Sequence, residues 1–163
     1  MGQVMELRTA IAGCDEGGFG AVVTADYGES TYTFSMNCQY DGKGNMNLSV
    51  TAPETISGIT AKIGQGTGMI TFDDQALVFE MIADDQISPI CAPWLVMEAL
   101  TSGYISACGM DGEYVRVRID DSFAGAQFSV DTWISSDNQP VRAEILWQGR
   151  RILSIDINEF VIV

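Results

Sequence analysis

Residues 31–51 show the clearest alternation of hydrophobic and polar positions in the chain. Every second residue is apolar or aromatic up to a glycine-rich stretch at 41–45, after which the alternation resumes. Successive side chains of a strand point to opposite faces, so this pattern predicts a β-hairpin. Its other face is polar enough for water. The face expected in the core carries Tyr32, Phe34, Met36, Cys38, Tyr40, Met46, Leu48 and Val50.

Shorter patterns of the same kind recur along most of the chain. Separated by turn residues, they predict antiparallel strands at hairpin spacing. The predicted strands cover residues 19–27, 59–63, 69–72, 76–82, 115–119, 126–134, 139–147 and 151–163.

Two segments instead have apolar residues at helical spacing. In residues 3–14, Val4, Leu7, Ile11 and Cys14 recur at intervals of three or four, which predicts a short amphipathic helix. A second helix is predicted from Ala92 to Ser102, after a capping serine and a proline and before a glycine. Its apolar stripe consists of Ile90, Trp94, Met97 and Leu100, widened by Leu95 and Val96.

These elements predict one α+β domain over residues 1–163. An antiparallel sheet of about eight or more strands tends to curl, because strands twist right-handedly. Two helices are too few to cover a flat sheet of this width. We therefore expect a curved sheet, or half-open barrel, with the N-terminal and the central helix on its concave face.

Charge and composition exclude several functions. The chain has 22 acidic and 8 basic residues and a formal net charge of −14. Such a field repels phosphate backbones and anionic lipid surfaces, which argues against nucleic-acid binding and electrostatic membrane binding. No apolar run approaches the roughly 20 residues that span a bilayer.

The chain has no histidine, which removes Ser-His and Cys-His nucleophile pairs and histidine-ligated metal sites. We expect no cofactor and no catalytic site.

The four cysteines leave two arrangements open. Cys14, Cys38, Cys91 and Cys108 allow two disulfides in three pairings, or four free thiols. Buried free cysteine is common, and Cys38 is in phase with the core face, which favours free structural cysteines.

Other charged and glycine-rich motifs have a structural and a functional interpretation. The pairs at 73–74, 84–85 and 120–121 offer oxygen ligands for Ca²⁺, but aspartate is also a favoured turn residue where a strand ends. The stretch 64–68 lacks the Lys-Ser/Thr that a phosphate-binding loop needs. Turns and a flexible loop are the preferred interpretations, and we expect no metal site. Arginines 116, 118, 142, 150 and 151 offer a site for a headgroup or carboxylates, although pairing with the abundant acids is favoured.

The order of elements resembles the superfamily of bacterial lipoprotein carriers and lipid-binding lipoproteins of the LolA/LolB/LppX type. Residues 51–60 (TAPETISGIT) and 139–145 (QPVRAEI), with the final strand through 155–160 (IDINEF), look like segments of small Gram-positive surface lipoproteins. The resemblance implies an apolar groove between sheet and helices that accepts a lipid or acylated ligand. It also implies an extracytoplasmic, cell-surface location through a lipid anchor outside this chain. Some relatives resemble spore-germination lipoproteins, which implies an alternative: a module that holds a cell-wall or spore-cortex enzyme.

Large, adaptable side chains suit the predicted groove, since methionine adjusts to varied apolar ligands. The same side chains would also fill an ordinary core, so the sequence leaves open whether the groove is open or full. The residues predicted to line it are Tyr32, Phe34, Met36, Met46, Leu48, Met69, Met81, Trp94 and Met97.

Overall fold

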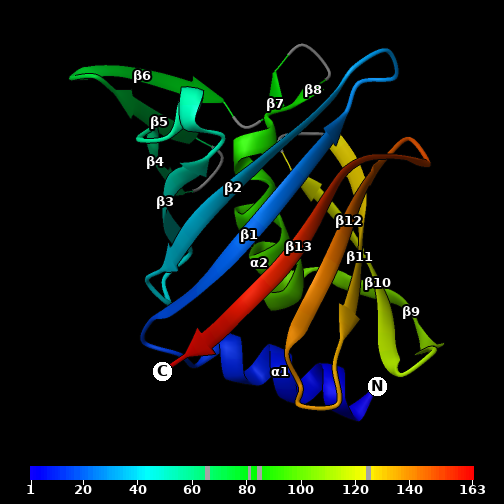
Figure 1. The fold of residues 1–163 in the computed structure, drawn as a ribbon. Helices are drawn as coiled ribbons and strands as arrows, with labels where there is room; N and C mark the ends of the chain where they lie inside the picture. Colours follow the sequence, from blue (N-terminus) through cyan, green and yellow to red (C-terminus); the bar gives the residue numbers. More distant parts are fainter. Residues whose placement is uncertain (65–66, 81, 84–85, 124–125) are drawn as a thin grey trace.

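The computed structural model describes residues 1–64, 67–80, 82–83, 86–123 and 126–163 (Figure 1). In chain order the elements are α1 (Gly2–Ala12), β1 (Gly17–Asp26), β2 (Thr31–Tyr40), β3 (Asn45–Ala52), the 3-10 turn η1 (Glu54–Ile56), β4 (Thr60–Gly64), β5 (Thr67–Phe72), β6 (Gln75–Glu80), β7 (Ile82–Ala83), β8 (Gln86–Ile87), the 3-10 turn η2 (Pro89–Cys91), α2 (Ala92–Ser102), β9 (Tyr104–Asp111), β10 (Tyr114–Phe123), β11 (Ala126–Ile134), β12 (Pro140–Trp147) and β13 (Arg150–Ile162). One helix precedes the strands β1–β8, and a second helix precedes the strands β9–β13.

Eleven strands form one antiparallel sheet in the order β6-β5-β4-β3-β2-β1-β13-β12-β11-β10-β9. Each strand pairs with its neighbour in sequence except at the centre, where β1 pairs with β13 and joins the two halves of the chain. The sheet curves strongly without closing, so β6 and β9 are its two edges. The predicted half-open antiparallel barrel is confirmed.

Helix α2 lies in the hollow of the sheet, and α1 lies across the end of the sheet near β11–β13 (Figure 1). The predicted bounds of the central helix are confirmed. Helix α1 ends at Ala12, two residues earlier than predicted, and Gly13 follows. Arg8 joins the helices because its Nε and Nη2 donate to the carbonyls of Leu100 (2.7 Å) and Ala99 (3.0 Å) at the C-terminus of α2. The positive charge of Arg8 also interacts favourably with the negative end of the α2 dipole.

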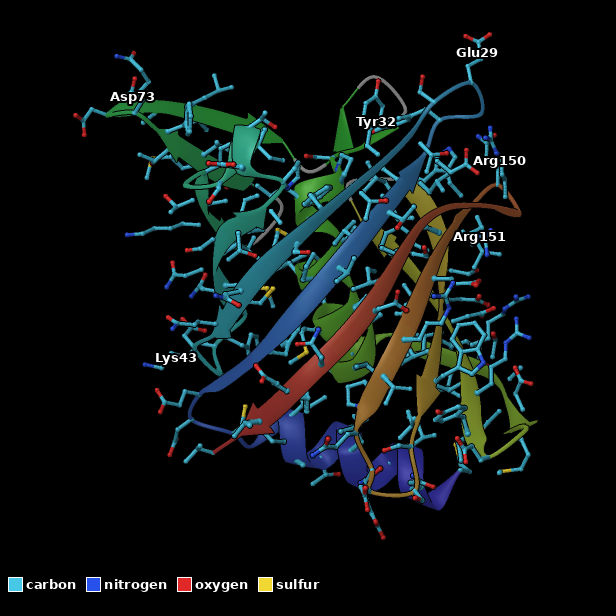
Figure 2. The ribbon with its side chains drawn as sticks, in the orientation of Figure 1. Glu29, Tyr32, Lys43, Asp73, Arg150 and Arg151 are labelled. Carbon is cyan, nitrogen blue, oxygen red and sulfur yellow. The ribbon has the colours of Figure 1, made fainter. Side chains whose placement is uncertain are left out.

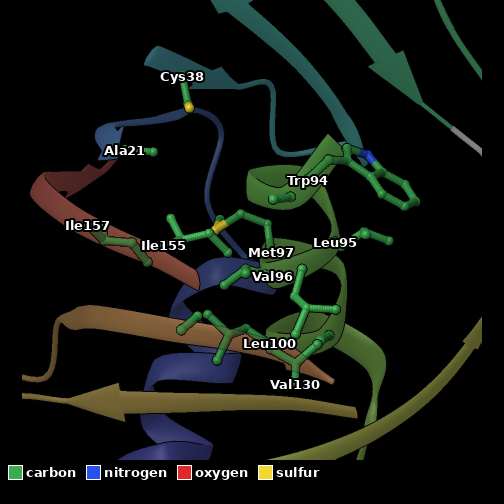
Figure 3. Packing of buried hydrophobic residues seen from close by; sticks show 14 of the residues in the cluster. Ala21, Cys38, Trp94, Leu95, Val96, Met97, Leu100, Val130, Ile155 and Ile157 are labelled. Carbon is green, nitrogen blue, oxygen red and sulfur yellow. The ribbon is translucent and has the colours of Figure 1, made fainter. Parts of the chain in front are cut away.

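The core lies between α2 and the concave face. Figure 3 shows Val96, Met97 and Leu100 of α2 directed toward the sheet residues Ile155 and Val130. The indole Nε1 of Trp94 donates to the carbonyl of Gly44 at 2.8 Å, which fixes the helix to the β2–β3 turn. Eight of the eleven residues of α2 are buried: Ala92, Pro93, Trp94, Leu95, Val96, Met97, Ala99 and Leu100.

Two local features differ from expectation. Strand β9 was not predicted, because its sequence YISACGMD alternates weakly; its pairing with β10 across a short turn imposes the extended conformation. Asp120 and Asp121 were expected where a strand ends, but they lie inside β10. The turn interpretation is confirmed for Asp73 and Asp74, which have φ of 51° and 63°. The pair at 84–85 and the middle of the 64–68 loop are outside the described residues.

Truncation of a side chain between α2 and the sheet should be costly. Met97 is 2% exposed, so Met97→Ala leaves a cavity, and we expect the free energy of unfolding in urea to fall by about 2–5 kcal/mol. Met110 is 69% exposed, so the control Met110→Ala should change it by less than about 0.5 kcal/mol. Equal stability of the two variants would contradict a packed centre.

Candidate ligand-binding site

The centre of the concave face is filled by side chains. Five of the residues predicted to line a groove are almost fully buried and belong to the continuous core cluster. They cannot contact a ligand unless core packing is displaced. They are Met36 (1% exposed), Met46 (1%), Leu48 (2%), Trp94 (3%) and Met97 (2%).

Two other predicted residues lie on the same face but are accessible. Tyr32 is opposite Ala25 in register, and Ala25 is 1% exposed, so both point to the concave side. Tyr32 itself is 58% exposed, because it lies at the start of β2, beyond the end of β3. Its ring is 5.8 Å from that of Tyr27, and Phe34 is half-buried two residues further along β2.

Met69, which was expected to line the groove, lies on the convex face of the sheet. Met69 is in register with Lys62 and Val78, whereas the buried residues of β4 are Ala61 and Ile63. Met69 therefore points to the convex, solvent side, where it is 37% exposed. Its size suggested a groove residue, but its phase in the strand decides the face. Met81 lies outside the described residues.

Correct phasing of β5 and β6 identifies apolar residues that the sequence interpretation missed. Ile70 is opposite Ala61 on one side and Leu77 on the other, and Phe72 shares its face. Phe72 is 46% exposed, Leu77 is 64% exposed and Ile70 is half-buried. The signal was present in residues 69–72, where Ile70 and Phe72 alternate with Met69 and Thr71.

Accessible apolar residues of the concave face lie toward both edges of the sheet, since Met110 of β9 shares the face of the buried Val117. We call those near the β6 edge and at the start of β2, namely Tyr32, Phe34, Ile70, Phe72 and Leu77, the open wall. They come from β2, β5 and β6, and none carries a charge. Acidic residues follow or precede them in the chain: Asp26 at the end of β1, and Asp73 and Asp74 in the β5–β6 turn. Figure 2 shows Asp73 at the tip of that turn. The open wall therefore offers apolar contact surface next to negative charge.

The convex face carries the arginines. The Asp131 carboxylate, 1% exposed, accepts hydrogen bonds from Arg116 Nη2 (2.6 Å), Arg118 Nε (2.7 Å) and Arg118 Nη2 (2.8 Å). The Arg116 guanidinium also lies over the Trp133 ring, 5.0 Å from its centroid, and the Trp133 indole donates to Asp111. These contacts occupy the two arginines and favour the pairing interpretation.

The last two strands show the same pairing. Arg142 bonds Asp156 at 2.8 Å and Glu144 at 3.4 Å, and Arg151 bonds Glu144 at 3.2 Å. Arg150 approaches Asp26 at 3.6 Å. Figure 2 shows Arg150 and Arg151 at the β12–β13 turn, away from the β5–β6 turn.

The pKa shifts of Asp131 and of two buried cysteines support structural roles for these side chains. Burial alone would raise the pKa of Asp131, but the hydrogen bonds and charges of Arg118 and Arg116 lower it below the ordinary aspartate value. All four cysteines are free. Burial raises the pKa of Cys91 to about 12 and that of Cys38 further, so both are protonated thiols at neutral pH and poor nucleophiles.

Within the described residues, no group of three or more histidine, cysteine, aspartate or glutamate residues is placed to hold a metal ion. In the same part of the chain, none of the helices has the length and apolar character that crossing a membrane requires.

No protein-family model and no curated protein matches the sequence. Solved structures share the fold at low identity. An uncharacterised conserved protein from Thermus thermophilus is 10% identical with a TM-score of 0.54 over 99% of this chain and 86% of its own. A LolA superfamily protein from Nitrosomonas europaea is 8% identical, with a TM-score of 0.50 over 96% and 92% of the two chains. A lipoprotein-sorting protein domain from Vibrio parahaemolyticus is 10% identical, with a TM-score of 0.51 over 98% and 91%. The resemblance to the LolA superfamily is therefore confirmed at the level of the fold.

The Asp131 cluster predicts a pH-dependent contribution to stability. Asp131→Asn removes the buried charge, and we expect a loss of about 1–3 kcal/mol in the free energy of unfolding at pH 7. Because the folded pKa is lowered, this contribution is complete above the unfolded value of about 3.9 and is lost as the pH falls below it. The free energies of unfolding of wild type and variant, measured in urea at several pH values, should become equal at acidic pH. The exposed Asp137→Asn is the control; a pH-independent difference for Asp131→Asn would contradict the assignment.

Proposed function

We propose that the protein binds an acyl chain or a similar apolar ligand on the open wall, as a non-enzymatic carrier or sorting protein of the cell envelope. The observation that carries this proposal is the exposure of Tyr32, Phe72 and Leu77 on the concave side of the sheet. Large apolar side chains in this position are the ones that a ligand would cover.

The energetics favour a ligand of this class. Burying apolar surface stabilises a complex by about 25 cal/mol per Å² before the costs of association are subtracted. Large exposed apolar side chains on one face of a soluble protein are candidates for a binding surface. The open wall carries no charge, so a ligand gains from contact with it without the desolvation of an ion in the protein.

The fold supports the same proposal from another direction. The structures that share it include a LolA superfamily protein and a lipoprotein-sorting domain. We extend this to an extracytoplasmic location and a lipid anchor for the present protein. The absence of histidine from the sequence and the engagement of Asp131 with two arginines argue against a hydrolytic function.

The filled centre distinguishes this proposal from a deep groove. Met36, Met46 and Met97 belong to the core, so we expect the ligand to lie beside α2 and not beneath it. Binding of this kind needs no movement of the helix, and the ligand stays partly accessible to solvent.

Binding of N-phenyl-1-naphthylamine, a neutral apolar fluorescent probe, tests the proposal. We expect the probe to bind the wild type and to bind the double variant Phe72→Gln/Leu77→Gln at least about tenfold more weakly, which corresponds to roughly 1.4 kcal/mol. The matched control is Val78→Gln, which changes the next residue of β6 on the opposite face and should keep wild-type affinity.

Three results would contradict the proposal: no binding to the wild type, equal binding to the double variant, or equal weakening by the control. Circular dichroism confirms that each variant is folded, and all three substituted residues are exposed, so folding should be retained.

A further inference from the structure

The outer edge of β6 is a second exposed feature, and it consists of backbone. β6 is the last strand of the eleven-stranded sheet and pairs on one side with β5; within the described residues no strand pairs with its other side. The pairing with β5 continues without a register shift from Phe72↔Gln75 to Thr67↔Glu80. The edge is therefore regular over six residues.

The geometry of the hairpin shows which backbone groups point outward. The two-residue turn at Asp73 and Asp74 has positive φ at both positions, as in a type I′ turn. In such a hairpin the closing pair, Phe72 and Gln75, exchanges both backbone hydrogen bonds, and every second pair after it does the same. The N–H and C=O groups of Ala76 and Val78 therefore point to the open edge.

The edge lacks the usual protection against strand addition. Exposed edge strands are commonly blocked by lysine, proline or a bulge. Residues 75–79 (QALVF) contain no charge and no proline, and β6 ends at Glu80, its one charged residue. Apolar side chains are exposed on both faces beside the edge: Leu77 (64%) on the concave side, and Val78 (72%) and Met69 (37%) on the convex side.

The convex side also has a depression of about 420 Å³. It is lined mainly by β3, β4 and β5, including Asn47, Lys62 and Met69, and it reaches β6 at Val78. Gly64 and Gly68 contribute no side chain to it. An added strand places alternate side chains on this face, next to the exposed side chain of Val78.

The charge around the edge selects the partner. Asp73 and Asp74 stand at the start of β6, and the whole chain has a net charge of −14. A second copy of the chain would bring the same acidic turn and the same net charge, so self-pairing is opposed by repulsion. A segment with lysine or arginine beside an apolar middle is attracted.

We propose that β6 binds an extended segment of another protein by strand addition, and that this segment is apolar in the middle and flanked by lysine or arginine. Backbone hydrogen bonds to Ala76 and Val78 supply affinity, and the apolar faces and acidic turn supply selectivity. The proposal does not depend on the apolar ligand of the open wall, since it uses the strand edge.

The opposite edge, β9, provides a matched comparison. β9 also has exposed apolar residues, Tyr104 (74%) and Met110 (69%). Its pairing with β10, however, contains a register shift between Arg118 and Ile119, and an irregularity of this kind discourages strand addition. Met110 lies one residue before the pair Asp111↔Tyr114 that closes its hairpin, so its N–H also points outward.

The experiment measures fluorescence anisotropy of a labelled peptide, Lys-Lys-Val-Thr-Val-Thr-Val-Lys-Lys, at about 50 mM salt, where charge attraction is weakly screened. We expect it to bind the wild type, and we expect the peptide with glutamate in place of lysine to bind at least about tenfold more weakly. Raising the salt to about 300 mM should narrow that difference.

Val78→Pro removes an outward N–H that makes no bond to β5, and proline is tolerated in this position of an edge strand. We expect it to weaken binding of the lysine peptide at least about tenfold, whereas Met110→Pro on β9 leaves binding unchanged. Val78→Lys keeps the backbone donor and should also weaken binding, because it adds a positive charge that repels the lysine peptide. This variant provides the test if Val78→Pro does not fold. Binding of N-phenyl-1-naphthylamine should survive Val78→Pro, which separates this inference from the proposed function.

Several results would overturn the inference: no binding of the lysine peptide up to about 1 mM, equal binding of the lysine and glutamate peptides, or equal effects of Val78→Pro and Met110→Pro. Sedimentation that shows a wild-type dimer and a monomeric Val78→Pro variant would also overturn it, because the occupant would then be a second copy of the chain.

Discussion

Packing of α2 into the hollow of the sheet is the interaction on which the rest of the structure depends. The helix is apolar around most of its circumference, so it is stable only when it is covered, and the curved sheet and α1 cover most of it. Met36, Met46 and Leu48 of the sheet are in turn buried in the same core cluster. Arg8 holds the C-terminal carbonyls of α2, and Trp94 holds the β2–β3 turn, so the position of the helix is fixed at both ends.

This packing determines where binding surface is left. Since α2 fills the centre, accessible apolar residues of the concave face remain toward the edges of the sheet: at the start of β2, on β5 and β6, and at Met110 of β9. The same incomplete closure leaves β6 with an unpaired edge. One outer part of the sheet thus offers two different surfaces: side chains on its concave face, and backbone groups at its edge. On the convex side of the other half of the sheet, the arginines form ion pairs with Asp131 and Glu144.

The sequence predicted what local patterns can encode. Alternation in residues 31–51 predicted the hairpin, and the spacing of Trp94, Met97 and Leu100 with a following glycine predicted the central helix with its bounds. Strand β9 was missed because its extended conformation is imposed by β10 and not by its own pattern. The size of Met69 does not determine its face; its register with Lys62 and Val78 places it on the convex side. Whether Met36 and Met97 line a space or fill it depends on how closely the helix approaches the sheet, which no local pattern records.

Photo-crosslinking with a diazirine-bearing fatty alcohol, followed by peptide mass spectrometry, tests most directly where an apolar chain binds. We expect labels on the open wall, at Tyr32, Phe72 or Leu77, with α2 unlabelled except at its exposed surface. Labels concentrated on Met36, Met46 and Met97 would show that the ligand enters beneath the helix and would contradict the filled centre.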